Sequence, residues 1–242
     1  MEVHTHTHTP RKKWTHYFWE FLMLFLAVFC GFLAEYQLEH KIEKERGKEY
    51  IQSFYDDLQK NQANCSRIID FNKQKISALN NLNACYDSLS KNWKATSCLA
   101  GLMKYSSFFW SVEFSDGTID QLKNAGGVRL LKKEDRDSII SYDEAIRNFE
   151  NTELTMVQPS QDNVRNNYKK LANFKAYYLT DSANHVVEIP LLFSDNKELL
   201  NEFFNDLLRY KRNIKIQSNQ LIQIKEKTNR LITYFKAKHH FD

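Results

Sequence analysis

The residues with metal-binding chemistry and regular spacing lie at the N-terminus of this sequence. His4, His6 and His8 alternate with threonine, and alternating imidazoles can share a Zn²⁺, Ni²⁺ or Cu²⁺ ion. A metal site also needs neighbouring groups that orient its ligands, and this short polar tract offers none. The pattern therefore favours a flexible, His-rich and basic tail over residues 1–13, and we expect no bound metal.

The other titratable residues show no catalytic spacing. Asp56 and Asp57 are neighbours, so on a helix they point to different faces and cannot act as an acid–base pair. His185 stands alone in a predicted loop, and His239-His240 lie at a C-terminus that we expect to be frayed. The sequence contains no Gly-rich phosphate loop, no His-Glu-x-x-His and no Gly-x-Ser-x-Gly. We expect no catalytic residue, no cofactor and no enzyme activity.

Composition and charge favour a folded helical protein without a nucleic-acid partner. The chain is 42% hydrophobic and 26% charged, which is ordinary for a folded protein. Six Gly and three Pro in 242 residues favour a few long helices over many short strands. The net charge is only +4, and a basic run on a mixed helix is usually a solvated face. That run consists of Arg209, Lys211, Arg212 and Lys215.

The four cysteines are too few for a disulfide framework and lack the spacing of a zinc site. Cys85 and Cys98 flank a predicted turn near residues 92–95, so they can pair if the surrounding compartment is oxidising. In a reducing compartment, both are expected to be small core residues.

One stretch departs from the polar average of the chain. From Phe21 to Ala34 every residue is apolar or Gly, a length of about 21 Å on a helix against the ~30 Å of bilayer hydrocarbon. Flanking aromatic residues extend the apolar span, and Glu20 and Glu35 then lie close to the two interfaces. We predict a transmembrane helix over residues 14–38, with the lipid bilayer as its partner.

Two alternatives compete with a membrane anchor. A cleaved signal peptide also has basic residues before an apolar region, but a cut after Ala34 would need a small residue where Phe32 stands. Cys30 is preceded by Phe29 rather than by the small residue that a lipoprotein site needs. A buried core helix of a soluble protein is the other alternative.

The predicted anchor has two unlike faces. At about 100° per residue, the phenylalanines at 18, 21, 25, 29 and 32 share one narrow face. Small residues on the opposite face allow close helix packing in membranes. We therefore predict self-association, or contact with another membrane protein, through a packing face formed by Glu20, Met23, Ala27, Cys30, Gly31 and Ala34.

Topology follows from the flanking charges. Arg11, Lys12 and Lys13 directly precede the predicted anchor, and the Lys and Arg residues of the long following body carry less weight. This pattern predicts a cytoplasmic N-terminus and a body outside the cytoplasm.

The body, residues 39–242, is predicted to be a bundle of long helices, and the fold is all-α. Residues 41–93 follow a seven-residue pattern, and the polar residues in this seam are of the kind that sets helix register. Its positions are Ile51, Phe54, Leu58, Asn61, Cys65, Ile68, Asn72, Lys75, Leu79, Leu82, Tyr86, Leu89 and Trp93. A second long helix alternates steps of three and four through Leu200, Phe203, Leu207, Tyr210, Ile214, Gln217, Leu221, Ile224, Thr228, Leu231 and Phe235.

Shorter elements are predicted between the two long helices. Thr118-x-x-Gln121 and Asp195-x-x-Glu198 resemble capping boxes and predict that helices start at Thr118 and at Asp195. Gly126-Gly127 should end the helix that begins at Thr118. The other helices are predicted over 97–110, 134–157 and 162–179, with a break at Pro159 and a loop or extended edge over 180–194.

Two segments have a familiar pattern. One is Lys12 to Leu38, with Phe-Leu-Met-Leu-Phe-Leu-Ala-Val-Phe-Cys-Gly-Phe-Leu-Ala-Glu, followed by Glu43 to Asp57. The other is Thr118 to Tyr142, with Gln121-Leu122-Lys123-Asn124-Ala125-Gly126, Arg129-Leu130, Arg136-Asp137 and Ile140. They resemble an uncharacterised Bacteroidetes-type family of small single-pass membrane proteins with a helical domain of unknown function. The resemblance implies an inner-membrane protein with a periplasmic body, and it implies no activity, ligand or catalytic residue.

These observations together predict a membrane-anchored helical interaction or scaffold module. The alternative is a sensor-like domain that binds a small molecule inside the bundle and acts with a separate output partner. A deep cavity lined by Asn72, Lys75 and aromatic residues would favour the sensor. An enzyme would require convergent titratable groups in a cleft.

Overall fold

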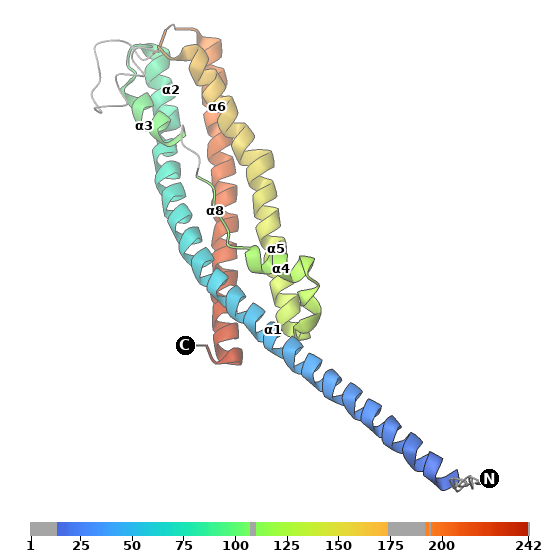
Figure 1. The fold of residues 1–242 in the computed structure, drawn as a ribbon. Coiled ribbons are helices and arrows are strands. Elements are labelled where there is room, and N and C mark those ends of the chain that lie inside the picture. Colours follow the sequence, from blue (N-terminus) through green and yellow to red (C-terminus); the bar gives the residue numbers. More distant parts are fainter. Residues whose placement is uncertain (1–13, 107–109, 174–191, 194, 242) are drawn as a thin grey trace, which may run out of the picture. The chain divides into compact units, whose positions relative to one another are not determined.

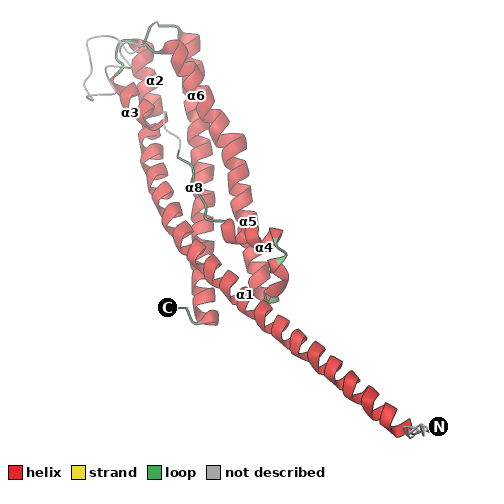
Figure 2. Ribbon diagram, in the orientation of Figure 1, coloured by secondary structure: helices red, strands yellow, loops and turns green. Residues whose placement is uncertain are grey.

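The computed structural model describes residues 14–106, 110–173, 192–193 and 195–241 of the 242-residue chain. Within these residues the structure is all-α and contains no β-strand (Figure 2). An isolated antiparallel bridge joins Ala172 to Leu192, at the described end of the predicted loop 180–194. Most of that loop lies outside the described residues. The helix predicted over 162–179 was too long, because the helix ends at Leu171 and Ala172 is extended.

The chain begins with a very long helix. Helix α1 (Trp14–Ala78) has 65 residues and continues through one 3₁₀ turn, η1 (Leu79–Asn81), into α2 (Leu82–Lys91). No proline occurs between Pro10 and Pro159, so every residue of this run can donate its backbone N–H to the helix. The chain divides into two compact units, one ending at Tyr50 and the other formed by Ile51–Asp242. This division reflects how compactly each part is folded and does not locate a membrane boundary. The predicted bounds of the anchor, 14–38, and of the body, 39–242, therefore stay predictions.

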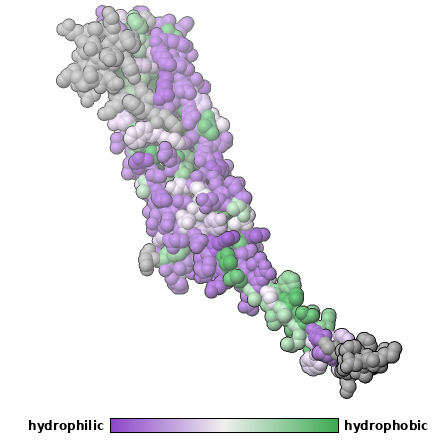
Figure 3. Space-filling view, viewed as in Figure 1, coloured by the Kyte–Doolittle hydropathy of each residue, from purple (hydrophilic) through white to green (hydrophobic). Residues whose placement is uncertain are grey.

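The first unit exposes its apolar residues. Its 18-residue apolar window has a mean hydropathy of 2.0 and is 0% buried, and Figure 3 shows a stretch of green hydrophobic atoms near the N-terminal end of the chain. By length and composition, this is the one helix among the described residues that can cross a membrane, although a signal sequence would have the same character. The core helix of a soluble protein would be mostly buried. The exposure of this apolar window therefore argues against a buried core helix.

The second unit buries its apolar residues among three long helical runs (Figure 1). Helix α8 (Lys197–His239) packs along α5 (Lys133–Thr152) and α6 (Gln158–Leu171), and also against α2. All predicted seam positions between Ile51 and Leu89 are buried except Tyr86, and Tyr86 and Trp93 are half-buried. Every predicted seam residue of α8 is buried. The three-and-four spacing therefore predicted the core faces of both long helices correctly.

Short helices lie at the two ends of this bundle. Helix α3 (Ser97–Ser106) follows α2, and α4 (Gly117–Asn124) with the 3₁₀ turn η2 (Gly127–Leu130) precedes α5. Gly126 has a φ of +65°, which confirms the left-handed helix end predicted at Gly126-Gly127.

Two predicted helix starts were wrong by a residue or two. The N-cap of α8 is Asn196, whose side-chain oxygen accepts hydrogen bonds from the backbone N–H groups of Glu198 and Leu199 at 3.0 and 3.1 Å. Helix α4 has Asp116 as its N-cap, and Thr118 does not cap it but donates its hydroxyl to Asp57 at 2.6 Å. Asp57 is thus a contact between elements and not a solvated surface residue.

The break predicted at Pro159 does not occur. The π turn η3 (Glu153–Val157) joins α5 directly to α6, and Pro159 lies in the first turn of α6. A proline lacks a backbone N–H and crowds the carbonyl four residues earlier, so it normally ends a helix. The carbonyl that Pro159 would crowd belongs to Thr155, which lies in the wider π turn. The helical run therefore continues to Leu171.

Candidate functional site

Three polar residues interrupt the apolar seam of α1, and all three are buried. Asn61, Asn72 and Lys75 are 0%, 1% and 1% exposed. A buried polar group that lacks a partner costs about 1–3 kcal/mol, so the partners of these residues show what the polar interior does. Each contacts a different part of the bundle, and together they mark the candidate site.

Asn61 holds a non-helical segment, residues 110–116, which we call the strap. Its amide accepts a hydrogen bond from the backbone N–H of Ser115 at 2.7 Å and donates one to the Ser115 carbonyl at 3.0 Å. Asn64 donates to the carbonyl of Glu113 at 2.9 Å. The side chains of α1 therefore bind the strap through its backbone.

The strap is extended along α1. The ring of Trp110 stacks on Phe71 with centroids 4.9 Å apart, and Ser115 reaches Asn61. Ten helical residues separate Phe71 from Asn61, or about 15 Å at ~1.5 Å per residue. Five strap residues cover that length, about 3 Å each, which is close to the rise of a β-strand. The strap runs from the α3 end of the bundle to α4 in Figure 1.

A buried carboxylate lies beneath the strap. Glu153 is 4% exposed and accepts hydrogen bonds from Ser111 Oγ of the strap and, at 2.6 Å, from Gln217 Nε2 of α8. The side-chain carbonyl of Gln217 in turn accepts a hydrogen bond from Asn72 Nδ2 of α1 at 3.0 Å. A chain of polar contacts thus links α1, α8, η3 and the strap through the core.

Burial raises the pKa of Glu153, while the hydrogen bonds from Ser111, Gln217 and the backbone of Val112 act in the opposite direction. The neighbouring charge of Glu150 also raises it. Glu153 is the first residue of the π turn, and such turns are frequent at functional sites. Asn213 of α8 donates to the carbonyl of Met156 in the same turn at 2.9 Å.

Lys75 is the second buried ionisable group. Its Nζ donates to the Tyr210 hydroxyl at 2.9 Å and lies 4.8 Å from the centroid of the Phe71 ring. Burial, with a smaller contribution from Arg165, lowers the pKa of Lys75 to about 8. The same Phe71 ring stacks on Trp110, so Lys75 is connected to the strap through one aromatic side chain.

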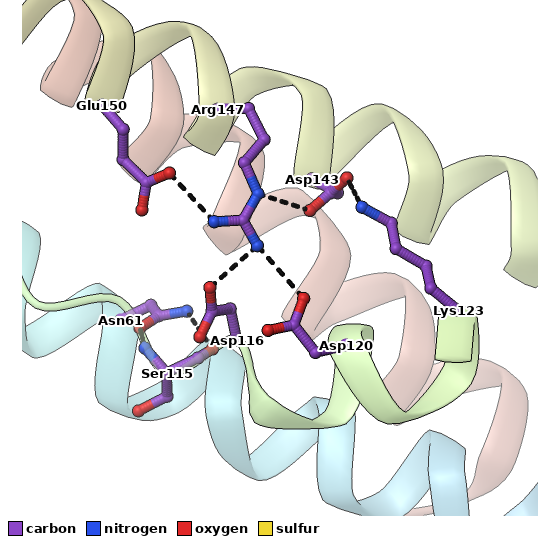
Figure 4. A network of polar contacts seen from close by, with 8 residues as sticks. All are labelled: Asn61, Ser115, Asp116, Asp120, Lys123, Asp143, Arg147 and Glu150. Carbon is purple, nitrogen blue, oxygen red and sulfur yellow. Dashed lines mark hydrogen bonds and ion pairs between the residues drawn. The ribbon is translucent and has the colours of Figure 1, made fainter. Parts of the chain in front are cut away.

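The C-terminal end of the strap is held by a cluster of charges around Arg147 (Figure 4). The guanidinium of Arg147 lies 2.9 Å from Asp116, 3.3 Å from Asp120 and 2.9 Å from Glu150. Glu150 and Asp116 raise the pKa of Arg147. Arg147 is 41% exposed, so each pair contributes little by itself. The cluster positions the strap end and α4 on α5.

A separate cluster lies at the end of α8. Asp135 is 2% exposed and accepts hydrogen bonds from Tyr234 and Lys238, each at 2.8 Å. Burial would raise the pKa of Asp135, but these hydrogen bonds outweigh it and lower the pKa. His239 lies 3.3 Å from Asp135 and ends α8, so the expectation that this histidine is frayed was wrong.

The predicted disulfide and packing face lie outside this polar interior. Cys85 and Cys98 form a disulfide with Cα atoms 5.5 Å apart, which joins α2 to α3, while Cys30 is free and exposed and Cys65 is free and buried. A Cβ added at Gly31 would meet no atom within 4 Å, so that position is open. The rest of the predicted face is also exposed: Glu20, Met23, Ala27, Cys30 and Ala34.

The strap and Glu153 were not predicted from the sequence. Asn61, Asn72 and Lys75 could be identified because they interrupt an apolar repeat, whereas Glu153 follows the polar residues Asn151 and Thr152 and looks like part of a solvated face. The described residues contain no group of three or more His, Cys, Asp or Glu side chains that could hold a metal ion.

Comparison of the chain with protein-family models, with characterised proteins and with solved structures found no match.

Proposed function

We propose that this chain is a single-pass, membrane-anchored helical interaction module. Its anchor is residues 14–38, its body lies on the periplasmic side of a bacterial inner membrane, and its partner is a second copy or another membrane protein. The fully exposed apolar window at the start of α1 carries this proposal, because water is a poor solvent for a helix without a polar face.

Continuity of the helix supports an anchor over a cleaved signal sequence. Helix α1 runs from Trp14 to Ala78 without a non-helical residue, so the apolar window and the first helix of the bundle are one element. A signal peptidase cleaves at small residues, and Phe32 stands where one is needed.

The cysteines and the flanking charges support a periplasmic body. A disulfide such as Cys85–Cys98 persists in an oxidising compartment, and the bacterial periplasm is one. Arg11, Lys12 and Lys13 favour a cytoplasmic N-terminus.

The polar interior supports an interaction role over a ligand sensor. A sensor would use Asn72 and Lys75 to contact a bound molecule, but Asn72 donates to Gln217 and Lys75 donates to Tyr210. These bonds tie α1 to α8 and leave the sensor as the weaker proposal.

Topology is tested with two reporters fused after Asp242. Alkaline phosphatase is active only outside the cytoplasm and green fluorescent protein fluoresces only inside it, so we expect phosphatase activity without fluorescence. Fluorescence with membrane-bound protein would contradict the periplasmic placement, and a soluble, shortened chain would show a cleaved signal sequence.

Self-association is tested by cross-linking at Cys30. This is the exposed free cysteine, since Cys65 is buried and the other two are paired. We expect a cross-linked dimer in membranes that Gly31→Ile abolishes, because the added side chain prevents close helix approach. Phe29→Ile, on the opposite face, is the matched control and should retain the dimer. A dimer that survives Gly31→Ile would refute this face.

A further inference from the structure

The strap is bound in the way that proteins bind extended peptides. Its contacts on α1 are Asn61, Asn64 and Phe71, and its contacts on α5 and η3 are Phe149 and Glu153. We call these five residues the strap site. They come from three elements, and all lie in the second compact unit.

Recognition in the strap site is mostly of backbone. Asn61 uses both its donor and its acceptor on the peptide groups of Ser115, and Asn64 bonds the carbonyl of Glu113. Glu153 also accepts from the backbone of Val112. Backbone hydrogen bonds give affinity for any extended chain, and the pockets for alternate side chains give specificity.

Four strap side chains can supply that specificity, and the first is Trp110, whose ring stacks on Phe71. Ser111 donates its hydroxyl to Glu153, Val112 is 6% exposed, and Phe114 packs its ring edge-on against Phe149 with centroids 5.6 Å apart. Glu113 between them points to solvent. The strap thus presents an aromatic, a hydroxyl, an aliphatic, an exposed and an aromatic residue in that order, followed by the backbone N–H of Ser115.

The carboxylate under the strap favours exchange of the occupant. Glu153 is 4% exposed with the strap in place, and burial of a carboxylate is costly even when hydrogen bonds offset part of the cost. That cost makes the covered state less stable than its contacts alone would suggest.

We propose that the strap site is a peptide-binding surface for extended segments of partner proteins, and that the strap is its resident competitor. A partner segment with the pattern aromatic–hydroxyl–aliphatic–any–aromatic would replace the strap and make the same backbone bonds. This inference rests on the proposed interaction role and adds the chemistry of the partner to it.

The test uses the full chain in detergent and a fluorescently labelled peptide of residues 110–116 with blocked ends. Ser115→Pro removes the backbone N–H that donates to Asn61. It therefore weakens binding of the strap without changing any residue of the strap site. Ser115→Ala keeps that N–H and is the matched control. We expect the Ser115→Pro chain to bind the peptide on the order of tenfold more tightly than the Ser115→Ala chain, because the competing strap is less occupied.

Two further measurements locate the binding. Asn61→Ala, added to Ser115→Pro, should abolish binding, and a peptide that itself carries proline in place of Ser115 should not bind. Equal peptide affinity for the Ser115→Pro and Ser115→Ala chains, or binding that survives Asn61→Ala, would overturn the proposal.

Phe114→Ala provides a second way to weaken the strap, and circular dichroism reports whether each variant is folded. If Ser115→Pro does not fold, the same tenfold comparison is made between Phe114→Ala and the unchanged chain, and equal affinities there overturn the proposal. Topology and cross-linking at Cys30 report on the anchor and do not involve the strap, so failure of the peptide test and failure of the proposed function are distinguishable.

Discussion

Phenylalanine side chains of the same helix have opposite surroundings in the two units of this chain. In the first unit, Phe21, Phe25 and Phe29 are 65%, 52% and 47% exposed and contact mainly one another. In the second unit, Phe54 is 0% exposed and packs edge-on against Tyr142 and Phe235. All four belong to α1, so residue type and secondary structure do not account for the difference.

The arrangement of the other residues accounts for it. Around Phe25 every neighbour along the helix is apolar, so no rotation of the helix hides the apolar surface, and a lipid environment suits all sides. Around Phe54 apolar residues recur in steps of three and four, which makes one stripe that a bundle can cover. The body then places polar residues, among them Asn61, within that stripe and binds them to partners.

Phe54→Ala gives the largest expected effect on this comparison. Removing a fully buried phenylalanine leaves a cavity and typically costs about 3–5 kcal/mol. The measurement is denaturant unfolding of the full chain in detergent, monitored by circular dichroism. Phe25→Ala is the matched variant on the exposed part of α1 and should change the free energy of unfolding of the body little. Equal effects of the two substitutions would show that both rings are buried to the same extent.

Val28→Arg tests the first unit in the same way. Val28 lies in the middle of the apolar window and is 59% exposed, so an arginine clashes with nothing in the chain but is costly in a bilayer, by about 2.5–3.5 kcal/mol. We expect a smaller fraction of the chain to remain in alkali-washed membranes. Leu208→Arg, at a 40% exposed position of α8, should leave that fraction unchanged. Full retention of the Val28→Arg chain would argue against a lipid environment for this window.

The lowered pKa of the buried Lys75 should make the free energy of unfolding of the body depend on pH. Its folded pKa of about 8 lies below the free value of 10.5, so between these values the unfolded chain holds a proton that the folded chain has lost. Stability must therefore rise with pH in this window.

The rise from pH 8 to pH 9.5 should be about 2 kcal/mol, because each pH unit contributes about 1.4 kcal/mol. Denaturant unfolding at several pH values measures it. Lys75→Met should abolish the rise, whereas Lys73→Met, on the solvent side of α1, should retain it. A rise that persists in Lys75→Met would assign the pH dependence to another group.

Asn196→Ala is expected to have the smallest effect. Loss of the N-cap of α8 typically costs about 1 kcal/mol, since two backbone N–H groups lose their acceptor. Asp195→Ala should cost much less, because no cap bond involves its side chain. Thermal unfolding of the two variants distinguishes the residues, and a larger loss in Asp195→Ala would restore the cap that the sequence pattern suggested.

The core faces could be predicted from the sequence because their cause is local. Each seam residue of α8, from Leu200 to Phe235, lies three or four positions from the next, and one buried stripe suffices to produce that spacing. The helical fold class follows from the same spacing and from the scarcity of Pro and Gly.

The candidate site could not be predicted because its causes are distant in sequence. Glu153 bonds Ser111, 42 residues earlier, and Gln217, 64 residues later, so nothing near Glu153 in the sequence marks it as buried. Trp110 of the strap was wrongly assigned to a helix over 97–110. Asn61 and Asn64, which bind the strap, lie 54 and 49 residues before their partners, so residues 110–116 carry no local sign of these contacts.

The π turn has a consequence for how this fold tolerates changes in length. A π turn holds one residue more than an α turn, so the run from α5 to α6 contains an extra residue that is absorbed locally. Buried positions step by four at Phe149, Glu153, Val157 and Gln161, and by the usual mixture of three and four on either side. Without that widened turn, the extra residue would rotate all of α6 by about 100° and turn Val164 and Tyr168 away from α8. The π turn thus accommodates one additional residue without changing which faces of α5 and α6 are buried. That residue lies next to the buried Glu153.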